Sequence, residues 1–167
     1  EFGLRRGRRE FTNWIDEQLS WKETCYVGDW SFLATLDLDG PDARDVLAAL
    51  SVNTFDGFDA GQAKHLVQCA ESGHVVAEGV LARTGESSFT LHGLPCYWTA
   101  YNLTAGANAD ADVETEWRDT FNFQVQGPNA IEVLDALTDG SLRDIEFIHF
   151  GTVEIADCEV TALRMGM

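Results

Sequence analysis

The chain has 167 residues, enough for one ordinary domain or two small subdomains, and a hydrophobic content of 45% excludes compositional disorder. Its 28 acidic and 11 basic side chains give a formal net charge of −17, which argues against a nucleic-acid partner because phosphate backbones bind basic surfaces. No apolar run approaches the roughly 18 residues that cross a bilayer, so we expect no membrane partner and a cytoplasmic protein.

The first segment of the chain differs in charge from the rest. Residues 1–12 form a basic N-terminal arm, and we expect residues 13–167 to form the folded domain. Asn13 is a good helix cap, with Asp16 three residues later. The charged and apolar residues that follow predict an amphipathic helix ending near Cys25.

A strand and a helix are predicted next, on either side of a Gly-Pro pair. The alternation in residues 29–40 predicts a strand, and Gly40-Pro41 ends it. Proline suits the first turn of a helix because its φ is already helical. An apolar stripe at helical spacing then follows, at Ala43, Val46, Leu47 and Leu50.

The middle of the chain reads as an antiparallel meander. Residues 64–70, 75–84 and 89–93 are strand-like runs separated by short turns rich in Gly and Ser. A short helix is expected over residues 96–103. The acidic segment 106–120 is either a loop or an edge strand.

The last third repeats the strand and helix pattern of the first. Residues 36–50 and 123–137 share Gly, Pro, Ala, Val, Leu, Ala and Leu at the same spacings, which predicts an internal repeat. We interpret each copy as a packing unit, in which Gly allows a sharp turn and the stripe buries a helix on a sheet. Residues 151–157 and 158–167 then alternate as a hairpin.

The order of these motifs resembles one known family. The run GPDARDVLAAL is followed by Asn53, by GQAKH, by the turn ESGH before VVAEGVL, and by QGPNAIEVL. This order resembles the folate-dependent family of the glycine-cleavage T-protein, an aminomethyltransferase, over nearly all of residues 13–167. The segments FTNWIDEQLSWKET, SLRDIEF and LRMGM are more similar to its tetrahydrofolate-dependent demethylase branch.

The resemblance implies an α+β fold of antiparallel sheets with packed helices, arranged as two related subdomains around a folate cavity. It implies tetrahydrofolate as cofactor, and transfer of an aminomethyl or methyl group from a small one-carbon donor or an aminomethyl carrier protein. Family members run to roughly twice this size. We therefore expect either a fragment or a short homologue that lacks the C-terminal part, belonging to a full-length enzyme.

A second hypothesis belongs to another functional class. A non-catalytic folate-binding or protein-interaction domain could keep the same fold without the chemistry. The motif that raises this alternative is the acidic pair of the family, which falls on Ala77 and Glu78, so that Ala77 replaces its first carboxylate.

Glu78 is the candidate catalytic residue. It lies among valines and a leucine, and a carboxylate in such surroundings could act as a general acid or base. The alternative is that Glu78 points to solvent from the outer face of a sheet. Successive strand residues face opposite ways, so Glu78 could replace the carboxylate missing at position 77 only after a register shift.

The candidate cofactor-binding residues come from the same resemblance, each with a structural alternative such as a turn, a cap or core packing. The four histidines are too dispersed for a metal template, and the cysteines form no CxxC pair, so we expect no metal. The candidates are Asn53, His65, Ala77, His92, Gly93, Tyr97, Tyr101 and Gln126.

The acid-rich, lysine-poor composition predicts a halophilic protein that is most stable at high salt. Salt shortens the Debye length from about 10 Å at 0.1 M to about 3 Å at 1 M, which screens the repulsion between surface carboxylates. We therefore expect the free energy of unfolding to rise along a KCl series followed by circular dichroism. Equal stability at low and molar KCl would contradict the prediction.

Overall fold

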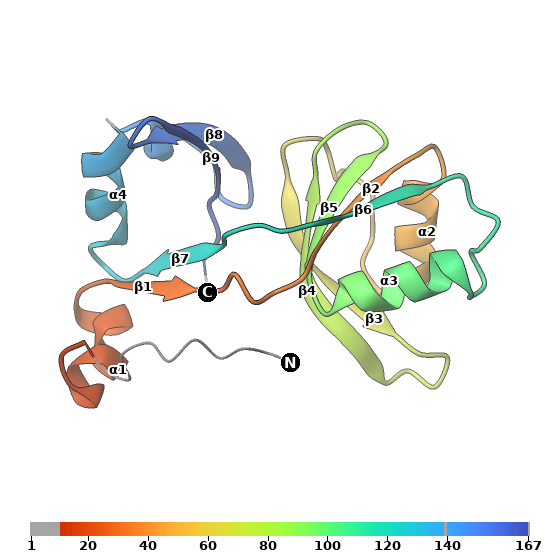
Figure 1. The fold of residues 1–167 in the computed structure, drawn as a ribbon, viewed down its shortest axis with the longest axis horizontal. Coiled ribbons are helices and arrows are strands. Elements are labelled where there is room, and N and C mark those ends of the chain that lie inside the picture. Colours follow the sequence, from red (N-terminus) through yellow and green to blue (C-terminus); the bar gives the residue numbers. More distant parts are fainter. Residues whose placement is uncertain (1–10, 139, 167) are drawn as a thin grey trace.

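The computed structural model describes residues 11–138 and 140–166, and it shows two groups of elements joined by two adjacent chain segments (Figure 1). Residues 1–10, most of the basic arm expected from the sequence, lie outside the described residues. Among the described residues, no helix is long and apolar enough to cross a membrane.

The larger group is a five-stranded antiparallel sheet in the order β3-β4-β5-β2-β6. The strands are β3 (Ala63–Cys69), β4 (Val75–Arg83), β5 (Ser88–Gly93), β2 (Thr35–Asp39) and β6 (Glu114–Arg118). The three-stranded meander predicted from residues 64–93 is confirmed, and the acidic segment does supply an edge strand.

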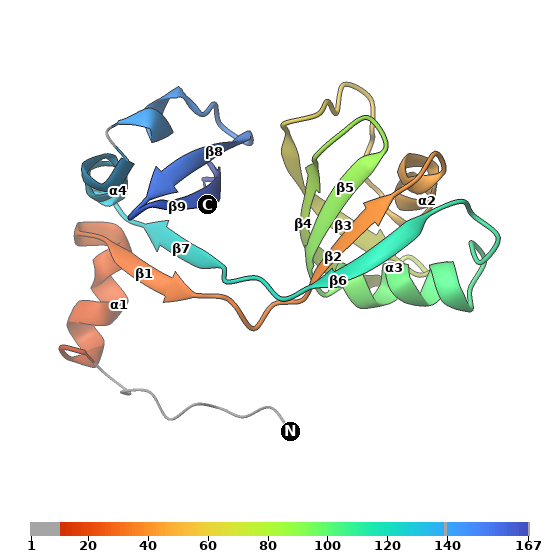
Figure 2. The same ribbon diagram turned by 45° about the horizontal axis from the view of Figure 1, so that its top comes forward.

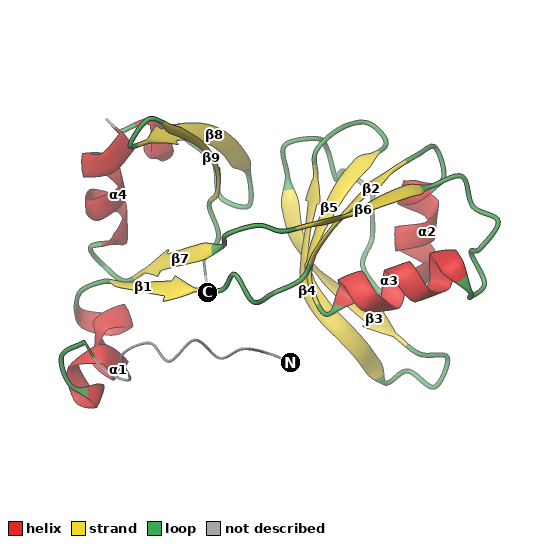
Figure 3. Cartoon of the chain, viewed as in Figure 1, coloured by secondary structure: helices red, strands yellow, loops and turns green. Residues whose placement is uncertain are grey.

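Two helices cover one face of this sheet, as Figure 3 shows. They are α2 (Ala43–Leu50) and α3 (Pro95–Thr104). The predicted stripe of α2 is buried at its first three positions, while Leu50 is only half-buried. Between sheet and helices lies the core, which contains Leu36, Leu38, Ala43, Leu47, Phe55, Phe58, Leu66, Leu81, Phe89, Leu91 and Cys96.

The smaller group holds the two ends of the described chain (Figure 2). Its helices are α1 (Trp14–Glu23), α4 (Ala130–Thr138) and the 3₁₀ helix η1 (Ser141–Asp144). Its strands form two antiparallel pairs, β1 (Tyr26–Asp29) with β7 (Phe123–Gln126), and β8 (Phe150–Ile155) with β9 (Cys158–Leu163).

Asn13 caps α1 as predicted, since its Oδ1 accepts hydrogen bonds from the backbone N–H groups of Ile15 and Asp16. The expected amphipathic packing of this helix is wrong, because Trp14, Leu19 and Trp21 are exposed. The helix ends at Glu23, two residues before the predicted end.

The long strand predicted over residues 29–40 is also wrong. Residues 26–29 form β1, residues 31–33 turn, and β2 begins only at Thr35. The turn is held by hydrogen bonds from Trp30 N to Asn122 O (2.8 Å) and from Asn122 N to Ser31 Oγ (3.1 Å). The alternation of residues 32–38 therefore crosses a break that only the tertiary contacts reveal.

Both Gly-Pro units form the predicted strand, turn and helix, and both show the same close backbone contact. Gly40 follows β2, and a Cβ added there would lie 2.2 Å from the carbonyl oxygen of Asp112, just before the paired strand β6. Gly127 follows β7, and its added Cβ would lie 2.5 Å from the carbonyl oxygen of Thr24, just before the paired strand β1. Glycine is needed at both turns because a neighbouring backbone occupies the side-chain position.

Replacing Gly40 by alanine should therefore destabilise the protein by at least about 2 kcal/mol, through strain at a φ of +152° and the clash with a backbone oxygen. Gly73→Ala is the matched control, since Gly73 also has a positive φ but no atom lies within 4 Å of its added Cβ. That control should cost only the strain, about 1–2 kcal/mol. Equal losses for both variants in urea denaturation would contradict the role of the contact.

Candidate functional site

The five-stranded sheet has a polar face on the side away from α2 and α3. Cross-strand partners share a face of a sheet, and one row of partners runs His65, Val80, His92, Thr35 and Arg118 across all five strands. Two of the predicted site residues, His65 and His92, therefore lie on the same face. We call this surface the polar face.

A second row on the polar face contains an aspartate with two partners. Asp37 pairs with Thr90 on β5, whose hydroxyl donates to Asp37 Oδ1 at 2.6 Å. On the other side, Arg118 Nη1 lies 3.4 Å from Asp37 Oδ2. The orientation of the Asp37 side chain is thus set by both neighbouring strands.

His92 is half-buried on the polar face. Its Nδ1 lies 3.1 Å from the hydroxyl of Thr35, which lies 2.9 Å from the hydroxyl of Thr120. Burial lowers the pKa of the His92 imidazole below its usual 6.5, while the nearby Asp37 carboxylate acts in the opposite direction. The ring is therefore neutral at pH 7, with Nε2 free of the hydrogen bond to Thr35.

Glu78 also lies on the polar face, paired in register with Val67. Its carboxylate is 3.5 Å from Nε2 of His65, and the two side chains are 63% and 59% exposed. Val67 and Val80 share this face with Glu78, but its side chain is exposed, which corresponds to the alternative that Glu78 points to solvent from the outer face of the sheet. The two groups form an exposed acid–base pair.

A β-bulge precedes Glu78. Gln68 pairs with Ala77, but Cys69 pairs with Val75, so the register of β3 against β4 shifts by one residue. The Ala77 side chain is buried on the helix side, next to Gln68. The extra residue of the bulge is Val76, so Ala77 and Glu78 both follow it in one register and face opposite sides of the sheet. The bulge therefore does not place Glu78 on the face of position 77, and the register shift that would let it replace a carboxylate there is not observed.

Asn53 is placed beside the edge strand β3. Its side-chain Nδ2 donates to the carbonyl of His65 at 2.9 Å, and its Oδ1 accepts from the N–H of Val67 at 2.8 Å. The Asn53 side-chain amide thus pairs with backbone groups on the free edge of β3, as a neighbouring strand would. Its observed partners are backbone groups, which favours the structural alternative of a turn or cap.

Gly93 ends β5 at the turn into α3. It is buried, has a φ of +96°, and pairs with Gly79 on β4. A Cβ at Gly79 would lie 2.2 Å from the carbonyl oxygen of His92, so the two glycines let the strands and Pro95 approach closely. Close packing of protein backbone explains this part of the motif.

Tyr97 and Tyr101 lie on α3, on the opposite side of the sheet from His65 and His92. Tyr97 packs against Trp117 with ring centroids 5.4 Å apart, and Tyr101 stacks on Trp98 at 5.7 Å. The structure does not bring these two aromatic residues to the polar face.

Gln126 lies on β7 in the smaller group of elements. The Tyr26 hydroxyl on β1 is 3.1 Å from Gln126 Oε1 and 2.8 Å from Gln124 Oε1 on β7. These hydrogen bonds link the two strands of this sheet. Gln126 is therefore separate from the row that contains His65 and His92.

Several polar residues of the face were missed by the sequence analysis. Strand alternation was the signal for Thr35 and Asp37, which flank the buried Leu36, and for Thr90, which precedes the buried Leu91. Arg118 lies in a strand whose residues are all exposed and Thr120 follows that strand, so no local pattern marks them.

Comparison with known proteins places the chain in a family. The model of the GCVT N-terminal domain matches residues 2–167. A sesamin methylene transferase from Sinomonas sp. (strain No.22) is 34% identical over 95% of this chain and 35% of its own length. A syringate O-demethylase from Sphingobium sp. (strain NBRC 103272 / SYK-6) is 31% identical over 95% of this chain and 37% of its own length.

A solved structure supports the fold. The glycine cleavage system aminomethyltransferase T from Bartonella henselae superposes with a TM-score of 0.69 at 18% identity, covering 81% of this chain and 38% of that one. The chain thus spans little more than a third of the proteins it matches. Both the α+β fold and the family resemblance expected from the sequence are confirmed, and the chain belongs to the family of the GCVT N-terminal domain.

Proposed function

We propose that the protein is a tetrahydrofolate-dependent one-carbon transferase whose polar face binds the pterin. The observation that carries the proposal is the row of His65, His92, Thr35 and Arg118 across one face of the sheet, in a chain of this family. The row offers imidazoles and a guanidinium on a rigid scaffold, where functional groups are held most accurately, while the buried Thr35 hydroxyl contacts His92 and Thr120.

The donor set fits a pterin, which presents both N–H donors and nitrogen or oxygen acceptors along its edges. Asp37 can accept from N–H groups, Arg118 can donate, and the free Nε2 of His92 completes a mixed set. A pterin carries no net charge on its ring, and such a mixture suits it better than a surface of one sign.

The bound folate supplies the nitrogen, N5, that receives the methyl or methylene group. The protein's own contribution is to orient the folate and the donor and to move protons. His65 and Glu78 are suited to proton transfer because they are 3.5 Å apart and in contact with water. His65 and His92 are two strand spacings apart in one row, about 10 Å, with Val80 between them, so a small molecule that contacts both rings would lie over Val80.

The identity of the one-carbon donor is the second part of the proposal. Two of the relatives are a sesamin methylene transferase and a syringate O-demethylase, and others are aminomethyltransferases. The higher identities of the first two favour an aromatic ether as the donor over an aminomethyl carrier protein. A protein that binds folate without transferring either group would instead be the non-catalytic domain considered above.

The first prediction concerns folate binding. Titration with 5-formyl-tetrahydrofolate should quench the fluorescence of the five tryptophans, and His92→Gln should raise the dissociation constant about tenfold, the effect of one lost hydrogen bond in a ligand site. His74→Gln is the matched control, because His74 lies in the turn between β3 and β4, with its Nδ1 3.0 Å from the Ser72 hydroxyl. The affinity of that variant should be unchanged.

Two outcomes count against the proposal. Absence of binding at both low and molar KCl would remove the folate hypothesis for this chain. Binding without transfer from aromatic methyl ethers, or from an aminomethyl carrier, would favour the non-catalytic alternative.

The second prediction concerns the protonation of His92. Because burial lowers its pKa in the folded state, the unfolded chain binds more protons just below pH 6.5, and stability should fall as the pH drops through that window. Melting temperatures measured between about pH 7.5 and 5 should therefore depend less on pH in His92→Gln than in the wild type, while His74→Gln should keep the wild-type slope. An NMR titration that places the pKa of His92 above 6.5 would contradict the assignment.

A further inference from the structure

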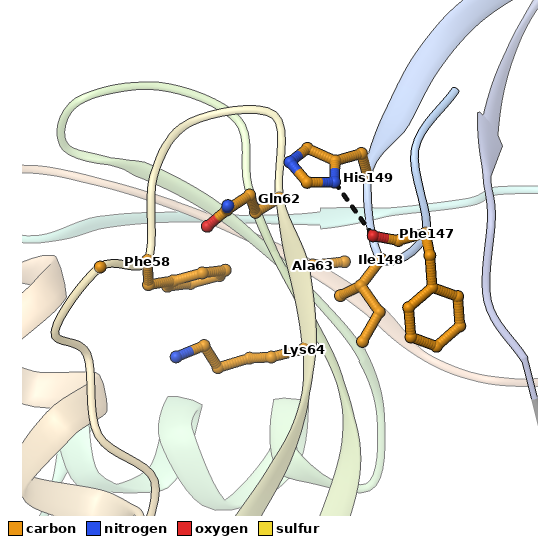
Figure 4. A pocket seen from close by; sticks show the side chains of 8 residues that line it. Phe58, Gln62, Ala63, Lys64, Phe147, Ile148 and His149 are labelled. Carbon is orange, nitrogen blue, oxygen red and sulfur yellow. Dashed lines mark hydrogen bonds between the residues drawn. The ribbon is translucent and has the colours of Figure 1, made fainter. Parts of the chain in front are cut away.

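The five-stranded sheet has two edge strands, and the edge of β3 is covered by other parts of the chain. Ala63 N donates to Ile148 O at 2.8 Å, and Figure 4 shows Ile148 beside Ala63 at the beginning of this strand. Farther along, Val67 N donates to Asn53 Oδ1 at 2.8 Å, and Val52 N donates to Val67 O at 3.0 Å. The β3 edge is therefore closed to a further strand.

The opposite edge strand, β6, is open in the described structure. Among the described strands it pairs with β2 alone, and all of its residues are exposed. Figure 2 shows β6 along the lower rim of the sheet. An unpaired edge of this kind presents backbone donors and acceptors to which another strand can bind.

The hydrogen bonds of β2 determine which backbone groups of β6 face outward. Gly93 N donates to Ala34 O at 2.8 Å, so Ala34 and every second residue after it direct their backbone groups toward β5. The intervening residues of β2 bond β6 at its first, third and fifth residues. The N–H and C=O groups of Thr115 and Trp117 therefore lie on the free edge, and no group in the described part of the chain bonds them.

We propose that β6 binds β6 of a second copy of this chain in antiparallel orientation, with Glu116 at the two-fold axis. In this register Thr115 lies opposite the partner's Trp117, and Trp117 lies opposite the partner's Thr115. Every outward N–H and C=O of the two strands then has a partner. Because the β3 edge is closed, the pairing ends at a dimer and does not continue into a filament.

The side chains of β6 are complementary in the same register. On the polar face, Glu114 lies opposite the partner's Arg118, so that two pairs of opposite charge flank the axis. On the helix side, the exposed Trp117, against which Tyr97 packs with ring centroids 5.4 Å apart, lies opposite the partner's Thr115. Pairs of an aromatic and a β-branched residue across strands stabilise a sheet.

Two features oppose this pairing and set the conditions of the test. Charged side chains discourage pairing at sheet edges, and Glu116 faces its own copy across the axis. Each chain also carries a net charge of −17. At 1 M KCl the Debye length is about 3 Å, which screens the repulsion between whole chains more than the contacts between directly opposed side chains. We therefore expect a weak dimer that tightens with KCl.

Sedimentation velocity of the whole chain over a concentration series at about 1 M KCl should show a reversible monomer–dimer equilibrium. Thr115→Pro removes an outward N–H but no bond to β2, and should raise the dissociation constant at least about tenfold. Thr115→Val keeps that N–H and a β-branched side chain, and should stay within about twofold of the wild type. Glu116→Gln removes the like-charge contact and should lower the dissociation constant about two- to fivefold.

Glu114→Arg separates the specific pairing from general charge effects. It places an arginine opposite the partner's Arg118, so the dissociation constant should rise about two- to fivefold although the net negative charge falls. Glu71→Arg is the matched control, since it makes the same change of charge in the exposed turn between β3 and β4. That variant should bind its own copy at least as tightly as the wild type does.

Disulfide cross-linking tests the register. Cα atoms paired at a non-hydrogen-bonded position are about 4.5 Å apart, within disulfide range, so Glu116→Cys should cross-link the two copies on oxidation with diamide. In Glu114→Cys the two new cysteines would be about 14 Å apart and should not cross-link. The wild type corrects for the native cysteines, of which Cys158 is exposed.

Three results would overturn the proposal. One is a monomer throughout the concentration series at molar KCl. Another is a dimer whose dissociation constant is unchanged in both Thr115→Pro and Glu114→Arg. The third is cross-linking of Glu114→Cys as readily as of Glu116→Cys.

Discussion

The position of β2 in the sheet determines what the polar face contains. Leu36 and Leu38 are fully buried against the helices, and a strand alternates, so Thr35 and Asp37 must face the other side. Because β2 lies between β5 and β6, those two residues meet His92, Thr90 and Arg118 directly. A shift of one residue in this strand would exchange the two faces, which would put an aspartate in the core and remove the site.

Much of this arrangement could be predicted from local patterns, but the assembly of the site could not. Alternation correctly located β3, β4 and β5, and it put His65 and His92 on strands. The same local reasoning grouped Tyr97 and Tyr101 with them, although α3 holds both tyrosines on the other side of the sheet. Proximity along the chain was a poor guide here, because α3 crosses to the helix layer immediately after Gly93.

The missed elements share a physical cause. The strand β1 is four residues long, contains a glycine, and is defined by pairing with β7 almost a hundred residues later. The partners of Asp37 on β5 and β6, Thr90 and Arg118, lie 53 and 81 residues away in the sequence. Such pairings depend on long-range contacts that no local period reveals. The repeated Gly-Pro pattern is the exception, since each glycine marks a turn where a distant backbone passes too closely for any side chain.

Net charge describes this protein poorly at the scale of a ligand. At physiological ionic strength the Debye length is about 8 Å, so a bound anion interacts mainly with the few charges inside that distance. Around Lys64, for example, those charges are the Arg44 guanidinium and the Asp56 carboxylate. On the polar face Arg118 is partly offset by Asp37. The polar face thus combines donors and acceptors of both signs within a short distance, which suits a neutral ring better than an ion of either sign.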